Sequence, residues 1–212
     1  MASAIIHIAV AKELYQYFDI ADKTDYYLGA IAPDIAKQIG RTKQESHFLY
    51  SEKENVPNIK MFTDKYPNFK NTSFDLGYYI HLFTDKLWFD KFLGQLVSNN
   101  AIKLMDGTIL HCKEEEIAKL IYMDYTNLNI QVIDEYKLDL SLFYEEFKVP
   151  QTKITEIPIE NLNILIDKMG IIIENSKSVK NYIFDIILIK KFIEDTTKRI
   201  LTELKDYEYI KD

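Results

Sequence analysis

The stretch from residue 76 to residue 89 is hydrophobic on almost every side if it forms a helix. Its sequence, LGYYIHLFTDKLWF, contains no proline, and a helix that is apolar all the way round is expected to be buried. His81 and Asp85 interrupt the stretch four residues apart, so both lie on one face, with Gly77 one turn earlier to admit a neighbouring backbone. An unpaired buried charge is costly. The pair therefore either forms a hydrogen bond of its own or binds a metal ion inside a bundle of helices.

Helical periodicity recurs along most of the chain, and turn-forming residues are few, with six glycines and five prolines. We therefore expect an all-α, multi-helix bundle that forms a single domain over residues 1–212. A loop at 148–158 divides it into a part with the candidate metal site, residues 1–147, and supporting helices within 159–212. The predicted helices cover residues 3–18, 25–32, 33–40, 56–66, 76–89, 89–97, 111–136, 140–147, 159–175 and 179–207, and a turn is predicted at Asp106-Gly107.

Composition excludes several classes of protein. A net charge of −7 argues against a nucleic-acid backbone as the main partner. The single cysteine, Cys112, rules out an internal disulfide and is typical of a reducing compartment. No apolar run reaches the length of a membrane span, and residues 1–7 lack the basic segment of a signal peptide. These features together predict a cytoplasmic protein without an integral membrane segment.

Three further polar residues lie near predicted hydrophobic segments. His7 falls on the apolar face of the first predicted helix, where a histidine is more often a hydrogen-bonded core residue than a ligand. Asp34 follows Pro33 in an apolar run, where it can also serve the dipole of a helix N-terminus. His47 lies in a polar connection at 41–56, and histidines in such loops are usually solvated.

The last histidine, His111, lies four residues before Glu115 at the start of a predicted helix. Glu115 belongs to an acidic first turn, which is favourable at a helix N-terminus without any metal. All four histidines therefore lie within the first 111 residues, and two acids, Asp34 and Asp85, accompany them. Imidazole nitrogen and carboxylate oxygen suit Zn²⁺, and also Mn²⁺ or Fe²⁺. Taken together, these residues favour a metal centre over several independent core residues.

The order of these segments resembles the bacterial zinc-dependent phospholipase C family. The resemblance covers about the first 90 residues and is carried by His7, LGAIAPDI at 28–35, SHF at 46–48 and GYYIHLFTD at 77–85. It implies an all-α fold that holds up to three zinc ions. It also implies hydrolysis of the phosphodiester between diacylglycerol and a phospholipid head group.

The resemblance also implies residue roles. Asp34, His47, His81 and Asp85 correspond to the ligands of one zinc, and Asp85 would bridge to a second ion that His7 also binds. Asp34 would lie beside the attacking water as ligand and general base. His111 and Glu115 would correspond to a pair that helps to hold the third zinc. The family's N-terminal tryptophan ligand and a further histidine after its His-x-x-x-Asp helix have no counterpart here, so one to three ions are expected.

Three functional hypotheses remain open. The first is a metal-dependent phosphoester hydrolase that acts on a small phosphoester or a phospholipid head group. The second is an HD-type nucleotide phosphohydrolase, which the absence of any His-Asp dipeptide disfavours. The third is a non-enzymatic helical binding protein whose metal is structural or absent.

Overall fold

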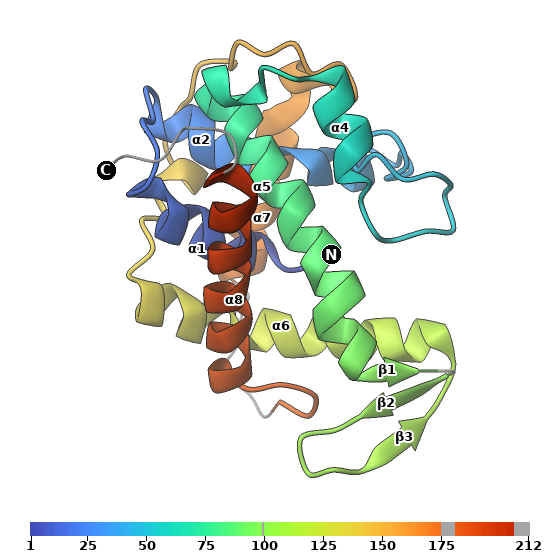
Figure 1. Ribbon diagram of the computed structural model, residues 1–212. Helices are drawn as coiled ribbons and strands as arrows, with labels where there is room; N and C mark the ends of the chain where they lie inside the picture. Colours follow the sequence, from blue (N-terminus) through green and yellow to red (C-terminus); the bar gives the residue numbers. More distant parts are fainter. Residues whose placement is uncertain (99, 175–180, 206–212) are drawn as a thin grey trace.

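The computed structural model describes residues 1–98, 100–174 and 181–205, and this part of the chain is mostly helical (Figure 1). The predicted helical class is confirmed, with one exception, a small three-stranded antiparallel sheet. The α-helices are α1 Ala4–Tyr15, α2 Lys23–Gly29, α3 Ile35–Gln38, α4 Ile59–Lys65, α5 Ser73–Leu87, α6 Glu114–Tyr136, α7 Leu162–Glu174 and α8 Ile186–Lys205. The strands are β1 Val97–Ser98, β2 Ala101–Lys103 and β3 Ile109–His111.

Short helical turns link these elements. The 3₁₀ turns are η1 Ala32–Asp34, η2 Phe69–Asn71, η4 Leu93–Gln95, η5 Ser141–Phe143 and η6 Ile159–Asn161, and η3 Trp88–Phe92 is a π-helical turn. Side-chain caps define where the main helices begin: Ser3 accepts from the backbone N–H of Ile6, and Thr72 accepts from that of Asp75. The cap at Thr72 starts α5 three residues before the apolar stretch begins.

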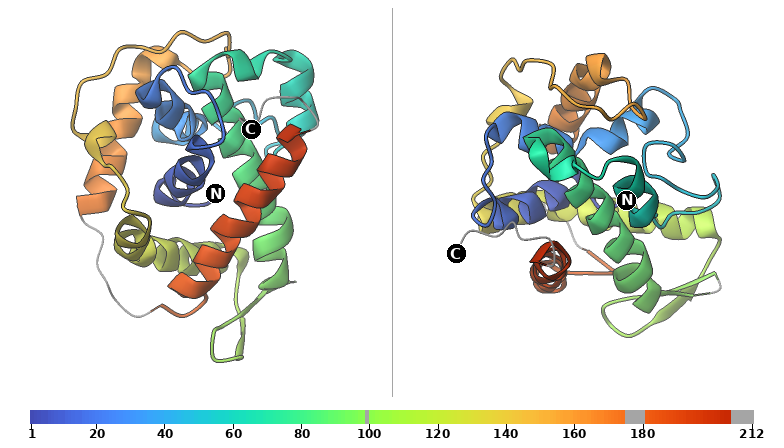
Figure 2. Two further views of the ribbon diagram at one scale, coloured as in Figure 1. Left: turned by 60° about the vertical axis from the view of Figure 1, so that its left-hand side comes forward. Right: turned by 45° about the horizontal axis from the view of Figure 1, so that its top comes forward.

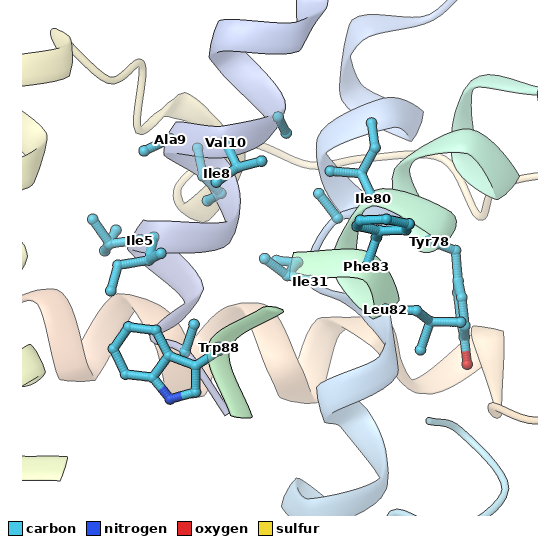
Figure 3. Close-up of a cluster of buried hydrophobic side chains, with 14 of the residues drawn as sticks. Ile5, Ile8, Ala9, Val10, Ile31, Tyr78, Ile80, Leu82, Phe83 and Trp88 are labelled. Atoms are coloured by element: carbon cyan, nitrogen blue, oxygen red, sulfur yellow. The ribbon is translucent and has the colours of Figure 1, made fainter. Parts of the chain in front are cut away.

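Helix α5 is the central element of the fold, as its all-round hydrophobicity predicts. Figure 1 shows it running from beside α2 to the small sheet, and both α1 and α8 contact it, with α8 crossing it at an angle (Figure 2). Residues of α1 and α5 supply most of the side chains labelled in the core cluster of Figure 3. This core cluster also includes buried residues of α7 and α8, so the C-terminal helices pack on the same core as the first half of the chain.

Helices α2 and α5 touch backbone to backbone. A Cβ atom at Gly77 would lie 2.1 Å from the carbonyl oxygen of Tyr26, and one at Gly29 would lie 2.0 Å from that of Phe74. Only glycine fits at such a contact. The close approach predicted at Gly77 is therefore present, and it brings the end of α2 against His81.

The segment from residue 88 to residue 113 corrects two helix predictions. The helix predicted over 89–97 is replaced by the turns η3 and η4 and by β1. The helix predicted to start at His111 starts at Glu114, because His111 pairs with Ala101 in the hairpin of β2 and β3. The turn predicted at Asp106-Gly107 closes this hairpin, and Gly107 has a φ of +87°.

The C-terminal half contains shorter helices than predicted. The helix predicted over 140–147 is only the 3₁₀ turn η5. The long C-terminal helix starts at Ile186, because buried Asp124 accepts hydrogen bonds from the backbone N–H groups of Tyr182, Ile183 and Phe184 and holds them outside a helix. Residues 175, 179–180 and 206–207 of the predicted helices lie outside the described residues. Among the described helices, none has the length and apolar character needed to cross a membrane.

Candidate metal centre

Five polar side chains from the first half of the chain meet inside the helical core. His7 comes from α1, Asp34 from η1, His47 from the turn at 43–49, and His81 and Asp85 from one face of α5. All five are buried, and Asp34 is the most accessible of them at 5% exposure. The structure thus brings together five of the seven residues that the sequence singles out as metal ligands.

Four of these side chains point one atom each at a common centre. The Nε2 atoms of His47 and His81 lie 3.3 Å apart. Asp34 Oδ1 lies 3.4 Å from Nε2 of His47 and 3.9 Å from Nε2 of His81. Asp85 Oδ2 lies 3.5 Å from Nε2 of His47 and 3.8 Å from Nε2 of His81. Four atoms bound to one zinc at about 2.0–2.1 Å in a tetrahedron lie about 3.3–3.4 Å from one another. Two of these five distances, 3.3 and 3.4 Å, match that value, and the other three are longer, at 3.5, 3.8 and 3.9 Å. The groups His7, Asp34 and His81, and His47, His81 and Asp85, each have the close spacing of side chains that could hold a metal ion.

The two buried carboxylate oxygens of this centre lack a well-placed donor. Among the described residues, neither Asp34 Oδ1 nor Asp85 Oδ2 has a partner with hydrogen-bond geometry, although Nε2 of His47 lies 3.4 Å from the first and 3.5 Å from the second. Nδ1 of His81 lies 2.8 Å from the carbonyl oxygen of Ala30, which can only accept, so Nδ1 carries the proton of the neutral ring and Nε2 is left with its lone pair. Two carboxylate oxygens and at least one imidazole lone pair therefore face one another. A cation satisfies such a set of acceptors.

The turn that carries His47 is fixed by neighbouring hydrogen bonds. Its Nδ1 lies 2.9 Å from Ser46 Oγ, and Ser46 Oγ also contacts the carbonyl oxygen of Lys43 at 3.4 Å. When Ser46 donates to that carbonyl, it accepts from Nδ1 of His47, and Nε2 is then a second free lone pair. The hydroxyl of Tyr78 on α5 donates to the carbonyl oxygen of Ser46 at 2.6 Å and holds the turn against the core. Such outer contacts orient metal-binding histidines.

The negative charges of Asp34 and Asp85 also favour the binding of a cation in the cluster. Burial alone would raise the pKa of Asp34, but His47 and His81 outweigh it and lower that pKa to about 2. Burial opposes ionisation of Asp85 as well, yet the chain's amino group, His7 and His81 hold its pKa well below the usual range. Burial lowers the pKa of His81 to about 3. The centre thus holds two carboxylates beside an imidazole whose charged form is disfavoured by burial, and a bound cation would offset the carboxylate charge.

His7 lies on the other side of Asp85. Its Nε2 is 3.3 Å from Asp85 Oδ1, which also accepts from the backbone N–H of Ala2 at 2.9 Å. The His7 ring stacks on that of His81 with centroids 3.8 Å apart, and among the described residues neither of its nitrogens has a partner that meets the angles of a hydrogen bond, the close Asp85 oxygen included. One ligand atom each of His7, Asp34 and His81 also lie within 4.8 Å of one another. Oδ1 of Asp85 therefore faces His7, and Oδ2 faces His47 and His81.

The other two candidate ligands lie elsewhere. His111 is exposed on β3, and Glu115 is exposed in the first turn of α6. Neither belongs to a group of side chains in residues 1–98, 100–174 and 181–205 that could hold a metal ion. Their role as ligands stays a prediction from the resemblance, without support from the arrangement of the described residues.

Two adjoining cavities beside the cluster are lined in part by Lys37 and Lys43, which sequence reasoning did not single out. A small cavity of about 170 Å³ is lined by Asp34, and a larger one of about 750 Å³ is lined by Lys43 and Trp88. Lys37, Tyr122 and other residues line both, so the two cavities adjoin. The positions of the two lysines in the sequence gave a partial indication that they lie near the cluster, because Lys37 follows Asp34 by three residues and Lys43 precedes His47 by four.

Comparisons with family models, curated proteins and solved structures found no match to this chain. The buried histidine and aspartate groups can hold a metal ion by their donor chemistry and spacing alone.

Proposed function

We propose that the protein is a metal-dependent phosphoester hydrolase that cleaves a phosphodiester. The observation that supports the proposal most is the group of four acceptor atoms from Asp34, His47, His81 and Asp85. Each of the two carboxylate oxygens lies between 3.4 and 3.9 Å from the Nε2 atoms of both histidines, neither has a hydrogen-bond donor among the described residues, and Asp34 lines a cavity. A structural zinc usually has four protein ligands, whereas a catalytic zinc keeps one position for water or substrate. In this proposal the ion therefore takes water as a further ligand from the side of the small cavity, which Asp34 lines.

In this proposal Asp34, His47, His81 and Asp85 hold one ion, and His7 and Asp85 hold a second where one binds. Zinc suits this set of nitrogen and oxygen donors, and Mn²⁺ or Fe²⁺ fit it as well. When bound, such an ion lowers the pKa of water and offsets the negative charge of phosphate oxygens.

The protein's own residues position the reactants. Asp34 is the cluster residue that lines the small cavity, so its carboxylate is the one that substrate and water can reach. Its Oδ1 faces the two histidines, which leaves Oδ2 to accept the proton of a water molecule that attacks phosphorus. The bond from phosphorus to the leaving oxygen then breaks. The core side chains around α5 exclude further water from the cluster.

The test is hydrolysis of bis(4-nitrophenyl) phosphate by zinc-loaded protein purified without a histidine tag. We expect release of 4-nitrophenol that stops after chelation and returns when zinc is added back. Asp34→Asn is the control for contaminating hydrolases, because it should abolish the activity in an identical preparation. A fully metal-loaded protein that cleaves neither phosphodiesters nor phosphomonoesters would refute the proposal and favour a binding protein with a structural metal.

A further inference from the structure

The larger cavity is big enough to hold a small organic ligand beside the metal cluster. Its volume of about 750 Å³ lies within the usual range for ligand pockets. Most of its wall is apolar or aromatic, with contributions from η3, η4 and α6. It adjoins the small cavity lined by Asp34, so a ligand in the larger cavity can extend towards the cluster.

Two lysines place their charges within this otherwise apolar wall. Nζ of Lys43 lies 5.7 Å from the centroid of the Phe89 ring, and Nζ of Lys37 lies 5.8 Å from that of the Tyr122 ring. Both distances are within the range of cation–π contacts. In the described part of the chain neither lysine forms an ion pair, although Lys43 is partly buried. Burial lowers the pKa of Lys43, and the charges of Asp85 and Asp34 act against that change.

The charge of the wall decides which kind of ligand fits. Lys37, Lys43 and Lys119 line the cavity, and Glu114 is the acidic residue among its described lining residues. The faces of Phe89 and Tyr122, where a quaternary ammonium group would stack, already carry lysine ammonium groups. A cationic head group would meet both repulsion and occupied rings. An anionic group would gain two unpaired ammonium donors.

We propose that Lys43 and Lys37 form an anion-binding subsite for the substrate. In this arrangement the substrate is an organic phosphoester that carries a negatively charged group at the lysines and an apolar or aromatic portion against the wall near Leu93 and Ile117. The assignment of this ligand as a substrate rests on the proposed hydrolase function, whereas the anion site itself rests on the geometry of the cavity.

Trp88 provides a direct readout of binding. It is the single tryptophan of the chain and lines the cavity, so its fluorescence reports on ligands there without any need for catalysis. The probe is phenyl phosphate, and phenyltrimethylammonium is its cationic counterpart with the same ring. We expect phenyl phosphate to change the fluorescence with a Kd that Lys43→Gln raises on the order of tenfold. Exposed Lys37→Gln should raise it by a smaller factor.

Lys53→Gln is the matched control, because Lys53 is an exposed lysine of the same connection and does not line the cavity. Lys53→Gln should leave the Kd within about twofold, because a single exposed charge contributes little. Lys43→Arg should also leave the Kd within about twofold, because it keeps the positive charge at the cavity. Each titration is run on zinc-loaded and on chelated protein, and the effect of Lys43→Gln should be present in both. Equal Kd values for Lys43→Gln, Lys37→Gln and Lys53→Gln, or tighter binding of phenyltrimethylammonium than of phenyl phosphate, would overturn the anion site.

A pair of chromogenic esters separates this inference from the proposed function. The first is 4-nitrophenyl phosphorylcholine, and the second carries a carboxylate in place of its trimethylammonium group. Faster cleavage of the anionic ester, with a raised KM in Lys43→Gln, supports both proposals. Cleavage of the choline ester in preference to the anionic one overturns the anion site and leaves the hydrolase proposal standing. Lysine-dependent binding of phenyl phosphate without cleavage of either ester overturns the hydrolase proposal and leaves the anion site standing.

Discussion

The ring of His81 on α5 is oriented by the carbonyl oxygen of Ala30, which follows α2, at 2.8 Å from Nδ1. This contact determines which nitrogen carries the proton and points Nε2 at Asp34, His47 and Asp85. It exists because Gly29 and Gly77 let the two helix backbones touch. The geometry of the candidate metal centre therefore depends on helix packing as well as on the ligands themselves.

We expect Gly77→Ala to weaken both the fold and the metal site. Its Cβ would lie 2.1 Å from the carbonyl oxygen of Tyr26, so α2 and α5 must move apart and the Ala30 carbonyl must leave His81. Overpacking of this kind typically costs about 1–3 kcal/mol, which urea denaturation measures. Gly94→Ala is the control, because the nearest atom to its Cβ would be 3.7 Å away. Equal stability and equal zinc affinity of the two variants would contradict this account of the helix contact.

Asp124→Ala should destabilise the protein without changing its metal content. Asp124 is 1% exposed and accepts from three backbone N–H groups before α8, at 2.9, 2.5 and 3.3 Å. Without it these donors are left buried and unpaired, at a cost of at least about 2 kcal/mol in the free energy of unfolding. Asp134→Ala, at an exposed position of the same helix, is the control and should cost little. If Asp124→Ala lost zinc as well as stability, the start of α8 and the metal cluster would be coupled more tightly than their contacts indicate.

Removal of the metal should lower the melting temperature. The ligands come from α1, η1, the turn at 43–49 and α5, so an ion that joins them stabilises the folded state over the unfolded one. Differential scanning fluorimetry with and without a chelator measures the shift. His111→Ala should show the same shift as the unaltered protein. An unchanged melting curve after proven removal of the metal would exclude a metal site within the core.

Asp34→Asn should reduce phosphodiester hydrolysis far more than His111→Ala. Asp34 lies in the cluster and lines the small cavity, whereas His111 is exposed on the hairpin. Loss of a general acid–base group typically costs roughly 10²–10⁴-fold in rate. The comparison of kcat in equally metal-loaded preparations tests the ranking. A larger loss in His111→Ala would place the catalytic centre elsewhere.

The pattern of hydrophobic residues predicts much of this fold, because α5 is buried on all sides and its polar pair has to meet partners. Caps at Ser3 and Thr72 likewise start helices close to the predicted positions. The hairpin at 97–111 is different. Its strands are only two or three residues long and expose much of their surface, so they leave almost no alternating pattern in the sequence.

The candidate site is predictable only in part, because its geometry depends on contacts between residues that are far apart in the sequence. His47 lies in a polar connection, and its burial depends on the Tyr78 hydroxyl, which holds the backbone of Ser46 from a distance of 32 residues. The roles of Lys37 and Lys43 depend on a cavity formed with η3 and α6, so their spacing from Asp34 and His47 alone does not reveal them. The spacing of the pair on α5, the apolar surroundings of His7 and Asp34, and the small number of histidines indicate a metal centre, and the resemblance to a known family groups these residues with His47 as ligands.

Elemental analysis of protein purified without a histidine tag tests the central claim most directly. The unaltered protein and the His81→Ala, Asp85→Ala double variant are supplied with zinc, dialysed and compared, with circular dichroism to confirm that both are folded. The converging acceptors of the cluster predict at least one equivalent of zinc in the unaltered protein and loss of that metal in the variant. Full occupancy in the folded variant, or unaltered protein that stays metal-free after zinc is supplied, would contradict the account.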